Sequence, residues 1–464
     1  MAPAAVRRGI TALALSLLPC AASAASDDEL AQIRAEIRQL KEAYEARIRA
    51  LEDRLKEAET RASAPPAIAT SPMPETAPPA PAATSTASGI AAFNPAISVV
   101  LQGRYASLSQ DPEQYRIAGF PSGGEIGPGR RGFSLAESEL AFSASVDHLF
   151  AGNLIIALSP DNEVSVEEAY GVVTAAPFGV VPKFGRFFSG LGYQNEQHQH
   201  AWDFIDAPLA YEAFLGGQYA NDGLQLKWVA PTEHFVELGA EIGNGDNFPG
   251  SRRGRNGVGS FAAYAHTGGD VGASHSWRAG LSYLSTRARD REYFQLDTVG
   301  NDALLGFSGD SDTVIADFVW KYAPNGNARG TNFKLQTEYF WRRERGDLTY
   351  DRDGALRSTQ TDGYRATQRG FYVQGVWQFM PAWRVGARYD RLDPGSIDYG
   401  ANAAFLHTMS FHPNRYSLMF DWTPSEFSRL RLQLARSKVR PDVTDDQLFL
   451  QYILTFGAHG AHKY

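Results

Sequence analysis

Two histidines near the middle of the chain are the residues whose spacing could hold a metal ion. His198 and His200 are one residue apart, and the acidic residues Glu196 and Asp203 flank them. In an extended segment this spacing can put both imidazoles on one side, and imidazole together with carboxylate suits Zn²⁺ or another divalent ion. The alternative is that these side chains are only hydrogen-bonded within a folded loop. Two histidines with loosely placed carboxylates leave both interpretations open.

Basic residues at alternate positions of short segments could instead select ions in a channel. Alternation places nine basic side chains on one, inward face: Arg104, Lys227, Arg278, Lys321, Lys334, Arg384, Arg388, Arg429 and Arg431. It places six acids on the same face: Glu139, Glu237, Glu241, Asp317, Glu338 and Asp390.

Four arginines of this set come from nearby segments with few inward acids: Arg384, Arg388, Arg429 and Arg431. We expect them to form an anion-attracting patch, because low-dielectric walls focus the electric field. The alternative is that the inward charges pair across the wall and hold it rigid.

The segments that carry these charges alternate as β-strands do. In QLFLQYILTF, residues 447–456, every second residue from Leu448 to Phe456 is apolar and the other face is mixed. A strand sends successive side chains to opposite faces, and ~9–11 residues of tilted strand cross a bilayer. The pattern recurs sixteen times, at 97–105, 139–146, 154–158, 164–174, 180–188, 224–228, 236–242, 260–266, 277–283, 314–322, 333–341, 371–379, 383–391, 416–422, 430–434 and 447–456.

The connections between these segments alternate in length. The short ones contain turn residues, at 175–179, 230–233, 380–382 and 423–426. The long ones are at 107–131, 189–222, 287–312, 345–367 and 393–413, and the connection at Pro160 is short where a long one is expected. Short turns on one side and long loops on the other are typical of outer-membrane barrels. The sequence therefore predicts an all-β fold, an antiparallel transmembrane β-barrel of about 16 strands over residues 94–464.

The connection at 189–222 is too aromatic and apolar for a loose surface loop. We expect its middle, residues 195–216, to fold into the barrel and narrow the lumen, burying residues such as Trp202 and Phe214. Three of its acids would then face basic residues of the wall across the gap: Asp203, Asp206 and Glu212.

The N-terminal region has three parts. Residues 1–24 have the charged start, apolar core and Ala22-Ser23-Ala24 site of a signal peptide. Residues 25–62 contain apolar steps of three and four without Gly or Pro from residue 27 on, which favours a self-associating coiled coil, although one amphipathic helix lying on the barrel is the alternative. The steps themselves do not decide the number of copies, and we expect a homotrimer because barrels of this type commonly form trimers. Residues 63–93 are a linker rich in Pro, Ala, Ser and Thr. We expect this arm in the periplasm, near the cell wall.

The C-terminal tail offers two further features. His459 and His462 are a weaker candidate metal pair, and either Tyr464 or Phe456 could serve as the terminal aromatic residue of an outer-membrane protein.

Several of these segments resemble one known family. KFGRF at 183–187, GLG at 190–192 and DFIDAPLAYEAF at 203–214 are similar to the phosphate-selective porin O and P family, as are Glu168-Ala169-Tyr170 and GFYVQGVWQFMPAWRVGARYDRLDPG at 370–395. The resemblance implies a trimeric porin with sixteen strands and an inward-folded third loop.

Composition excludes several other classes. The net charge is −8 without a basic run in the barrel region, which argues against nucleic-acid binding, and the single cysteine, Cys20, lies in the leader. No G-x-S-x-G motif is present, so we expect neither an enzyme nor a cofactor. The expected function is passive diffusion of small hydrophilic solutes or ions through the outer membrane, in contact with its lipid and biased towards anions. The alternatives are a TonB-linked or metal-related uptake receptor and an envelope tether.

Overall fold

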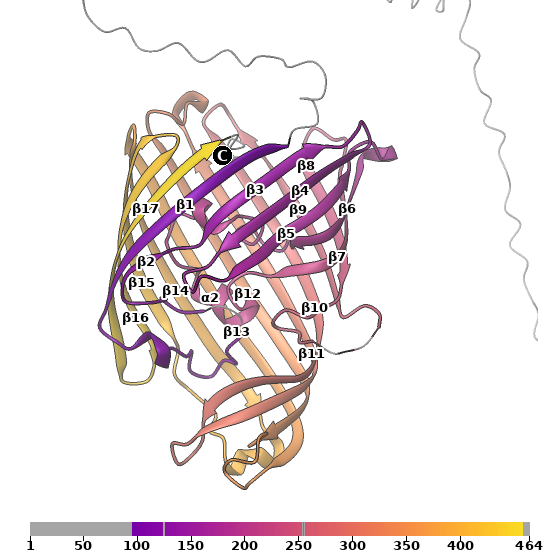
Figure 1. Cartoon of the computed structure of the whole chain (residues 1–464), viewed down its shortest axis with the longest axis vertical. Coiled ribbons are helices and arrows are strands. Elements are labelled where there is room, and N and C mark those ends of the chain that lie inside the picture. The colour runs from indigo at the N-terminus through magenta and orange to yellow at the C-terminus, as the bar shows by residue number, and fades with distance from the viewer. Residues whose placement is uncertain (1–94, 124–125, 253, 255, 458–464) are drawn as a thin grey trace, which may run out of the picture. The chain divides into compact units, whose positions relative to one another are not determined.

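The described part of the chain forms one closed β-barrel. The computed structural model describes residues 95–457, apart from 124–125, 253 and 255. The first strand, β1 (Ala96–Leu108), pairs with the last, β17 (Val443–Gly457), and this pairing closes the sheet. β2 (Gly132–Leu135) and β3 (Ser138–Ser145) both pair with β1 and form one barrel strand interrupted at Ala136 and Glu137. The barrel therefore has sixteen antiparallel strands, as predicted (Figure 1).

Each remaining strand pairs with its neighbours in sequence, in an up-and-down order. The strands are β4 (Phe150–Leu158), β5 (Val164–Val173), β6 (Val180–Phe188), β7 (Ala220–Val229), β8 (Phe235–Gly243), β9 (Ser260–Val271), β10 (His275–Leu296), β11 (Asp302–Tyr322), β12 (Asn332–Tyr350), β13 (Gln360–Met380), β14 (Trp383–Asp398), β15 (Asn414–Ser425) and β16 (Ser428–Arg440). Each of the sixteen predicted segments lies on one strand, and two of them, 139–146 and 164–174, extend one residue beyond it.

Within residues 95–457, helices are few and short. The α-helix is α2 (Leu209–Leu215), and the 3-10 turns are η2 (Pro112–Gln114), η3 (Pro177–Gly179), η4 (Gln199–Ala201), η5 (Pro324–Gly326) and η6 (Gly400–Ala404). Among the residues that the structure describes, no helix is both long and apolar enough to cross a membrane.

The two faces of the wall differ as the alternation predicts. On β17, Gln447, Gln451 and Thr455 are buried on the inward face, while Leu450 and Leu454 on the outward face are exposed. Outward apolar side chains continue around the barrel, because in a bilayer this face contacts lipid tails rather than water.

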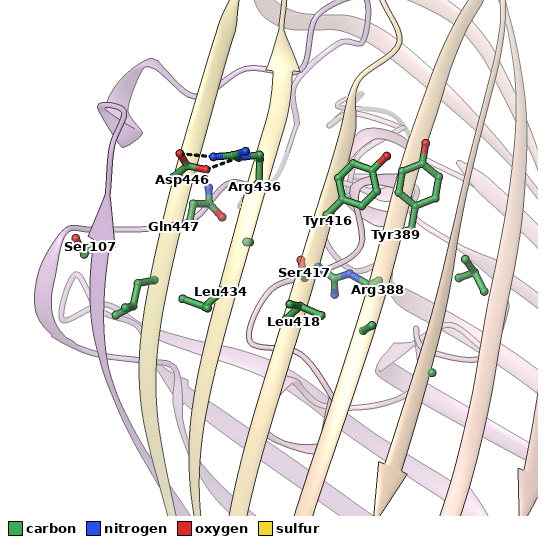
Figure 2. Close-up of a pocket in the computed structure, with 15 residues that line it drawn as sticks. Ser107, Arg388, Tyr389, Tyr416, Ser417, Leu418, Leu434, Arg436, Asp446 and Gln447 are labelled. Carbon is green, nitrogen blue, oxygen red and sulfur yellow. Dashed lines mark hydrogen bonds and ion pairs between the residues drawn. The ribbon is translucent and has the colours of Figure 1, made fainter.

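The outer surface between β13 and β1 has a shallow apolar hollow of about 850 Å³, shown in Figure 2. At one end of it, Tyr389 and Tyr416 lie with ring centroids 4.8 Å apart, and Arg436 Nε lies 2.7 Å from Asp446 Oδ1. These four residues are register partners across β14–β17 and so form one row. Tyrosine and exposed charge in one row mark the height at which the hydrocarbon layer ends on the long-loop side.

Two predicted loops are wrong. The segments 287–312 and 345–367 are mostly strand, because β10, β11, β12 and β13 run for 19 to 22 residues, well beyond the ~9–11 that cross a bilayer. The extensions have their own core, which includes Tyr293, Leu305 and Phe307. Charged outward residues such as Arg287 and Asp310 replace the apolar ones there, so the membrane pattern on which the prediction depended ends before the strands do.

Candidate functional site

The connection between β6 and β7, residues 189–219, packs against inward-facing side chains of the barrel; we call it the β6–β7 loop. All residues of α2 within it are buried. Tyr211 packs on Phe340 of β12, with ring centroids 5.1 Å apart, and the same core includes Tyr372 of β13 and Leu392 of β14. Figure 1 shows α2 beside β12, β13 and β14. The aromatic residues predicted to be buried, Trp202, Phe204, Tyr211 and Phe214, are therefore buried in the structure.

A second connection, residues 109–131, also packs on the β6–β7 loop. Phe120 lies edge-on to Phe214 with centroids 5.6 Å apart, and Tyr115 Oη donates a 2.6 Å hydrogen bond to Glu212 Oε2. Two connections that are distant in the sequence, residues 109–131 and the β6–β7 loop, therefore fill the interior at this height.

Inward acids of the wall hold the first part of the β6–β7 loop by its backbone. Glu241 accepts a 2.9 Å hydrogen bond from the Gly190 N–H, and Glu338 accepts 3.2 and 3.1 Å bonds from the N–H groups of Tyr193 and Gln194. Buried backbone donors need partners, and these carboxylates supply them. Both acids were expected to face inward, and in the structure they accept hydrogen bonds from backbone N–H groups of the loop.

The three predicted loop acids meet basic side chains of the opposite wall. Asp203 lies 2.5 Å from Lys334 Nζ and 3.4 Å from Arg384, and Asp206 lies 2.9 Å from both Arg388 and Arg415. These pairs join the loop to β12, β14 and β15.

The third acid, Glu212 on α2, lies 3.0 Å from Arg415. Arg415 is therefore shared between Asp206 and Glu212, and it is almost completely buried. Removing one partner of such a buried pair leaves the other charge uncompensated, which is strongly destabilising.

The pKa values of the loop acids reflect this balance. Burial alone would raise the pKa of Asp206, but Arg388 and Arg415 lower it to about 2. Burial also tends to raise the pKa of Asp203, but Lys334 and Arg384 lower it below its ordinary value. For Glu212, burial outweighs Arg415, and its pKa is raised.

The four arginines of the predicted patch lie close to more acidic side chains than expected. Asp421 of β15 lies 2.5 Å from Arg384 and 2.7 Å from Arg431. Arg388 additionally lies 2.9 Å from Asp390 on its own strand. Arg429 donates a 3.3 Å hydrogen bond to the carbonyl of His200, and among the described residues no carboxylate lies within 4 Å of it. Three of the four arginines are therefore paired.

Three further predicted basic residues also lie on the inward face. Lys227 pairs with Glu196 of the loop at 2.5 Å, and Arg278 donates a 3.1 Å hydrogen bond to the Gly192 carbonyl. Arg104 places its guanidinium 5.9 Å from the Phe449 ring centroid.

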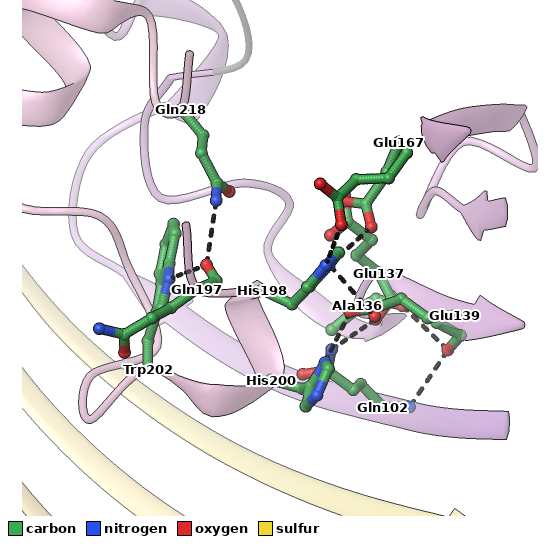
Figure 3. A network of polar contacts seen from close by, with 12 residues as sticks. Gln102, Ala136, Glu137, Glu139, Glu167, Gln197, His198, His200, Trp202 and Gln218 are labelled. Atoms are coloured by element: carbon green, nitrogen blue, oxygen red, sulfur yellow. Dashed lines mark hydrogen bonds and ion pairs between the residues drawn. The ribbon is translucent and has the colours of Figure 1, made fainter. Parts of the chain in front are cut away.

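The two histidines are brought together with three glutamates of the wall, as Figure 3 shows in part. His198 Nδ1 lies 3.1 Å from Glu167 and 3.5 Å from Glu139, and its Nε2 lies 3.1 Å from Glu168. His200 Nδ1 lies 2.7 Å from Glu139. The expected carboxylates, Glu196 and Asp203, are not the partners because each pairs with a lysine. The candidate pair His459 and His462 lies outside the described residues.

Sequence reasoning missed two kinds of residue here. Arg415 and Asp421 follow the inward alternation of β15. Asp421 lies inside the predicted segment 416–422, and extending that segment by one residue would have included Arg415. Glu167 and Glu168 are consecutive, so alternation assigns them to opposite faces, and nothing in the sequence indicates that both reach His198.

No family model matches the chain. An uncharacterized protein of Aquifex aeolicus is 28% identical over 402 residues, which is 80% of each chain. Among solved structures, the outer membrane channel DcaP of Acinetobacter baumannii is similar with a TM-score of 0.48 and 13% identity, over 79% of this chain and 99% of that one. An anion-selective porin from Comamonas acidovorans is similar with a TM-score of 0.47 and 10% identity, over 78% and 99%. OprB of Pseudomonas putida is similar with a TM-score of 0.44 and 15% identity, over 78% and 94%.

The paired state of Asp206 predicts how stability depends on pH. Because the folded pKa, about 2, is below the ordinary value, the carboxylate stabilises the fold above pH ~4 and loses this effect as pH falls through 2. The shift corresponds to about 2 kcal/mol. We expect the difference in free energy of unfolding between the native protein and Asp206→Asn to be constant from pH 8 to 5 and to shrink from pH 4 to 2. Denaturant titrations in detergent at each pH measure it, and a difference independent of pH would contradict the pairing.

Proposed function

We propose that this protein is an outer-membrane channel for the passive diffusion of small hydrophilic solutes and ions, narrowed by the β6–β7 loop. The observation that carries the proposal is the fastening of this loop, which starts between β6 and β7, to β12–β16 by Asp203, Asp206 and Glu212. In a sixteen-stranded barrel, β14 and β15 lie opposite β6 and β7, so the loop crosses the interior. A crossing segment held by buried ion pairs would set a fixed size limit.

The charge balance at the crossing supports a slight preference for anions. Six basic side chains meet there: Lys334, Arg384, Arg388, Arg415, Arg429 and Arg431. Five acids accompany them: Asp203, Asp206, Glu212, Asp390 and Asp421. One positive charge is in excess, and Arg429 is the member without a carboxylate within ion-pair distance in the described part of the chain. Low-dielectric walls strengthen the effect of such a charge on passing ions.

The proposed channel assembles as a homotrimer through residues 25–62, whose apolar steps of three and four favour a coiled coil. In this proposal the arm sets the oligomeric state and the spacing to the cell wall, while the barrel alone sets permeability.

Removing the crossing segment tests the constriction. We expect deletion of residues 195–216 to raise single-channel conductance several-fold in planar bilayers and to admit larger neutral solutes, because the fastened segment no longer occupies the interior. Heat-modifiable migration on SDS gels confirms that the variant barrel is folded. A folded variant with unchanged conductance and size limit would contradict the proposal, as would ohmic steps being absent from the native protein.

Removing the arginines tests the anion preference. Replacing Arg384, Arg388, Arg429 and Arg431 by Ser leaves two basic residues against five acids, so the reversal potential in a salt gradient should shift towards cations. Because this variant leaves buried acids unpaired, Arg429→Gln is the second variant, and we expect a smaller shift in the same direction. Arg436→Gln, on the outward face of the same strand, is the matched control and should change nothing. An unchanged reversal potential in folded Arg429→Gln would contradict the assignment.

Deleting residues 27–62 separates the roles of arm and barrel. We expect the purified variant to lose the trimer by native mass spectrometry and to keep the conductance per barrel. Retention of the trimer would contradict the role of the arm, and loss of conductance in a folded variant would contradict the separation of roles.

A further inference from the structure

The cluster formed by His198, His200, Glu139, Glu167 and Glu168 lies apart from the pairs with β12–β16 and is not used by the proposed channel function. We propose that Glu139, Glu167 and His198 bind one divalent transition-metal ion, such as Zn²⁺, which ties the β6–β7 loop to β3 and β5. The site does not depend on whether the barrel conducts.

The ligand atoms are close enough to share an ion. One atom each from Glu139, Glu167 and His198 lie within 4.8 Å of one another, and all three residues are buried or half-buried. Nitrogen and oxygen ligands bind Zn²⁺ at about 2.0–2.2 Å, so a small inward adjustment of these side chains would complete three ligands. Water could supply the fourth, as it does in open zinc sites.

The orientation of the His198 ring is the strongest argument. Both of its ring nitrogens face carboxylates: Nε2 faces Glu168, and Nδ1 faces Glu139 and Glu167. A neutral imidazole carries one N–H, so it can donate in one direction only and would direct a lone pair at a carboxylate in the other. Either a second proton or a metal cation must fill that position, and two carboxylates converging on Nδ1 form the ligand set of a cation site.

Glu168 has the position of a residue that orients a metal-binding histidine. It lies 3.1 Å from Nε2 and is itself fixed by a 3.0 Å hydrogen bond from the Phe188 N–H. A carboxylate only accepts, so it holds the proton on Nε2 and leaves the Nδ1 lone pair towards Glu139 and Glu167. Carboxylate–histidine–metal arrangements of this kind are general in metal sites.

The backbone of β5 is shaped for this cluster. Ile155 pairs with Glu168 but Ile156 pairs with Val166, so Glu167 is an extra residue in a β-bulge. Consecutive strand residues ordinarily point to opposite faces, whereas here Glu167 and Glu168 both reach His198. Bulges re-aim side chains next to functional sites at the cost of ladder pairing.

The two glutamates of β5 pair directly with a histidine rather than with a lysine or an arginine. Among the described residues, no lysine or arginine comes within ion-pair distance of Glu167 or Glu168. His200 supports the arrangement through its 2.7 Å contact with Glu139, and its ring stacks on His198 with centroids 5.9 Å apart.

Zinc titration of the full-length protein in detergent tests the site. After EDTA treatment and removal of the chelator, calorimetry should show one Zn²⁺ bound per chain at this site, and Co²⁺ should give the visible absorption of a nitrogen–oxygen site. Glu168→Gln should weaken binding by about 10–100-fold. His198→Ala and Glu167→Gln, which remove ligands, should weaken it further.

Two controls make the result specific. His275→Ala changes a histidine that stacks on Trp320 on the outer wall, and it should leave binding unchanged. The double variant His459→Ala/His462→Ala removes the tail histidines, and it should retain the site. Absence of stoichiometric binding would overturn the proposal and leave a second proton on His198. Equal binding by the native protein and folded Glu167→Gln would also overturn it.

Discussion

Every buried acid that the β6–β7 loop carries to the opposite wall meets a basic side chain there, and the interior depends on this match. Transferring a carboxylate out of water is expensive unless an opposite charge accompanies it. Arg415, which serves both Asp206 and Glu212, is the centre of the match. Without it the aromatic face of α2 could still pack on Phe340 and Tyr372, but Glu212 would be left uncompensated and Asp206 would keep only Arg388. The charges therefore determine where the loop lies, and the apolar contacts determine how closely it packs.

The loop is held differently at its two ends. Near β6, wall carboxylates such as Glu241 and Glu338 accept hydrogen bonds from backbone N–H groups of the loop. These bonds fix the path of the chain and do not depend on which side chains the loop carries. Further along the loop, its side chains pair with side chains of β12–β16, so its position there depends on which residues it carries. Between these stretches, His198 and His200 lie against β3 and β5. Contacts in three directions make the loop part of the wall rather than a flap attached at one edge.

The sixteen strands could be predicted because lipid imposes an apolar residue at every second position. That constraint ends with the hydrocarbon layer, so the extensions of β10–β13, where Arg287 and Asp310 face outward, read as loops. The same alternation places Arg384, Arg431 and Asp421 inward, but it could not show that Asp421 pairs with both arginines, because pairing across strands depends on register. The approach of Glu167 and Glu168 to one histidine depends on a bulge, and a single inserted residue leaves no periodic signal.

The pairing of β1 with β17 also sets an order of events during biogenesis. All other strand pairs join neighbours along the chain, whereas Gln102 and Gln451, which share a hydrogen bond, are 349 residues apart. Until the last strand docks, the sheet has two free edges, each a row of unpaired N–H and C=O groups. The loop that fills the interior contacts β3 and β5 early in the chain and β16 near its end. Neither the closed sheet nor the packing of the β6–β7 loop inside it can therefore be completed before nearly the whole chain is present. Closure of the barrel is a late, single step.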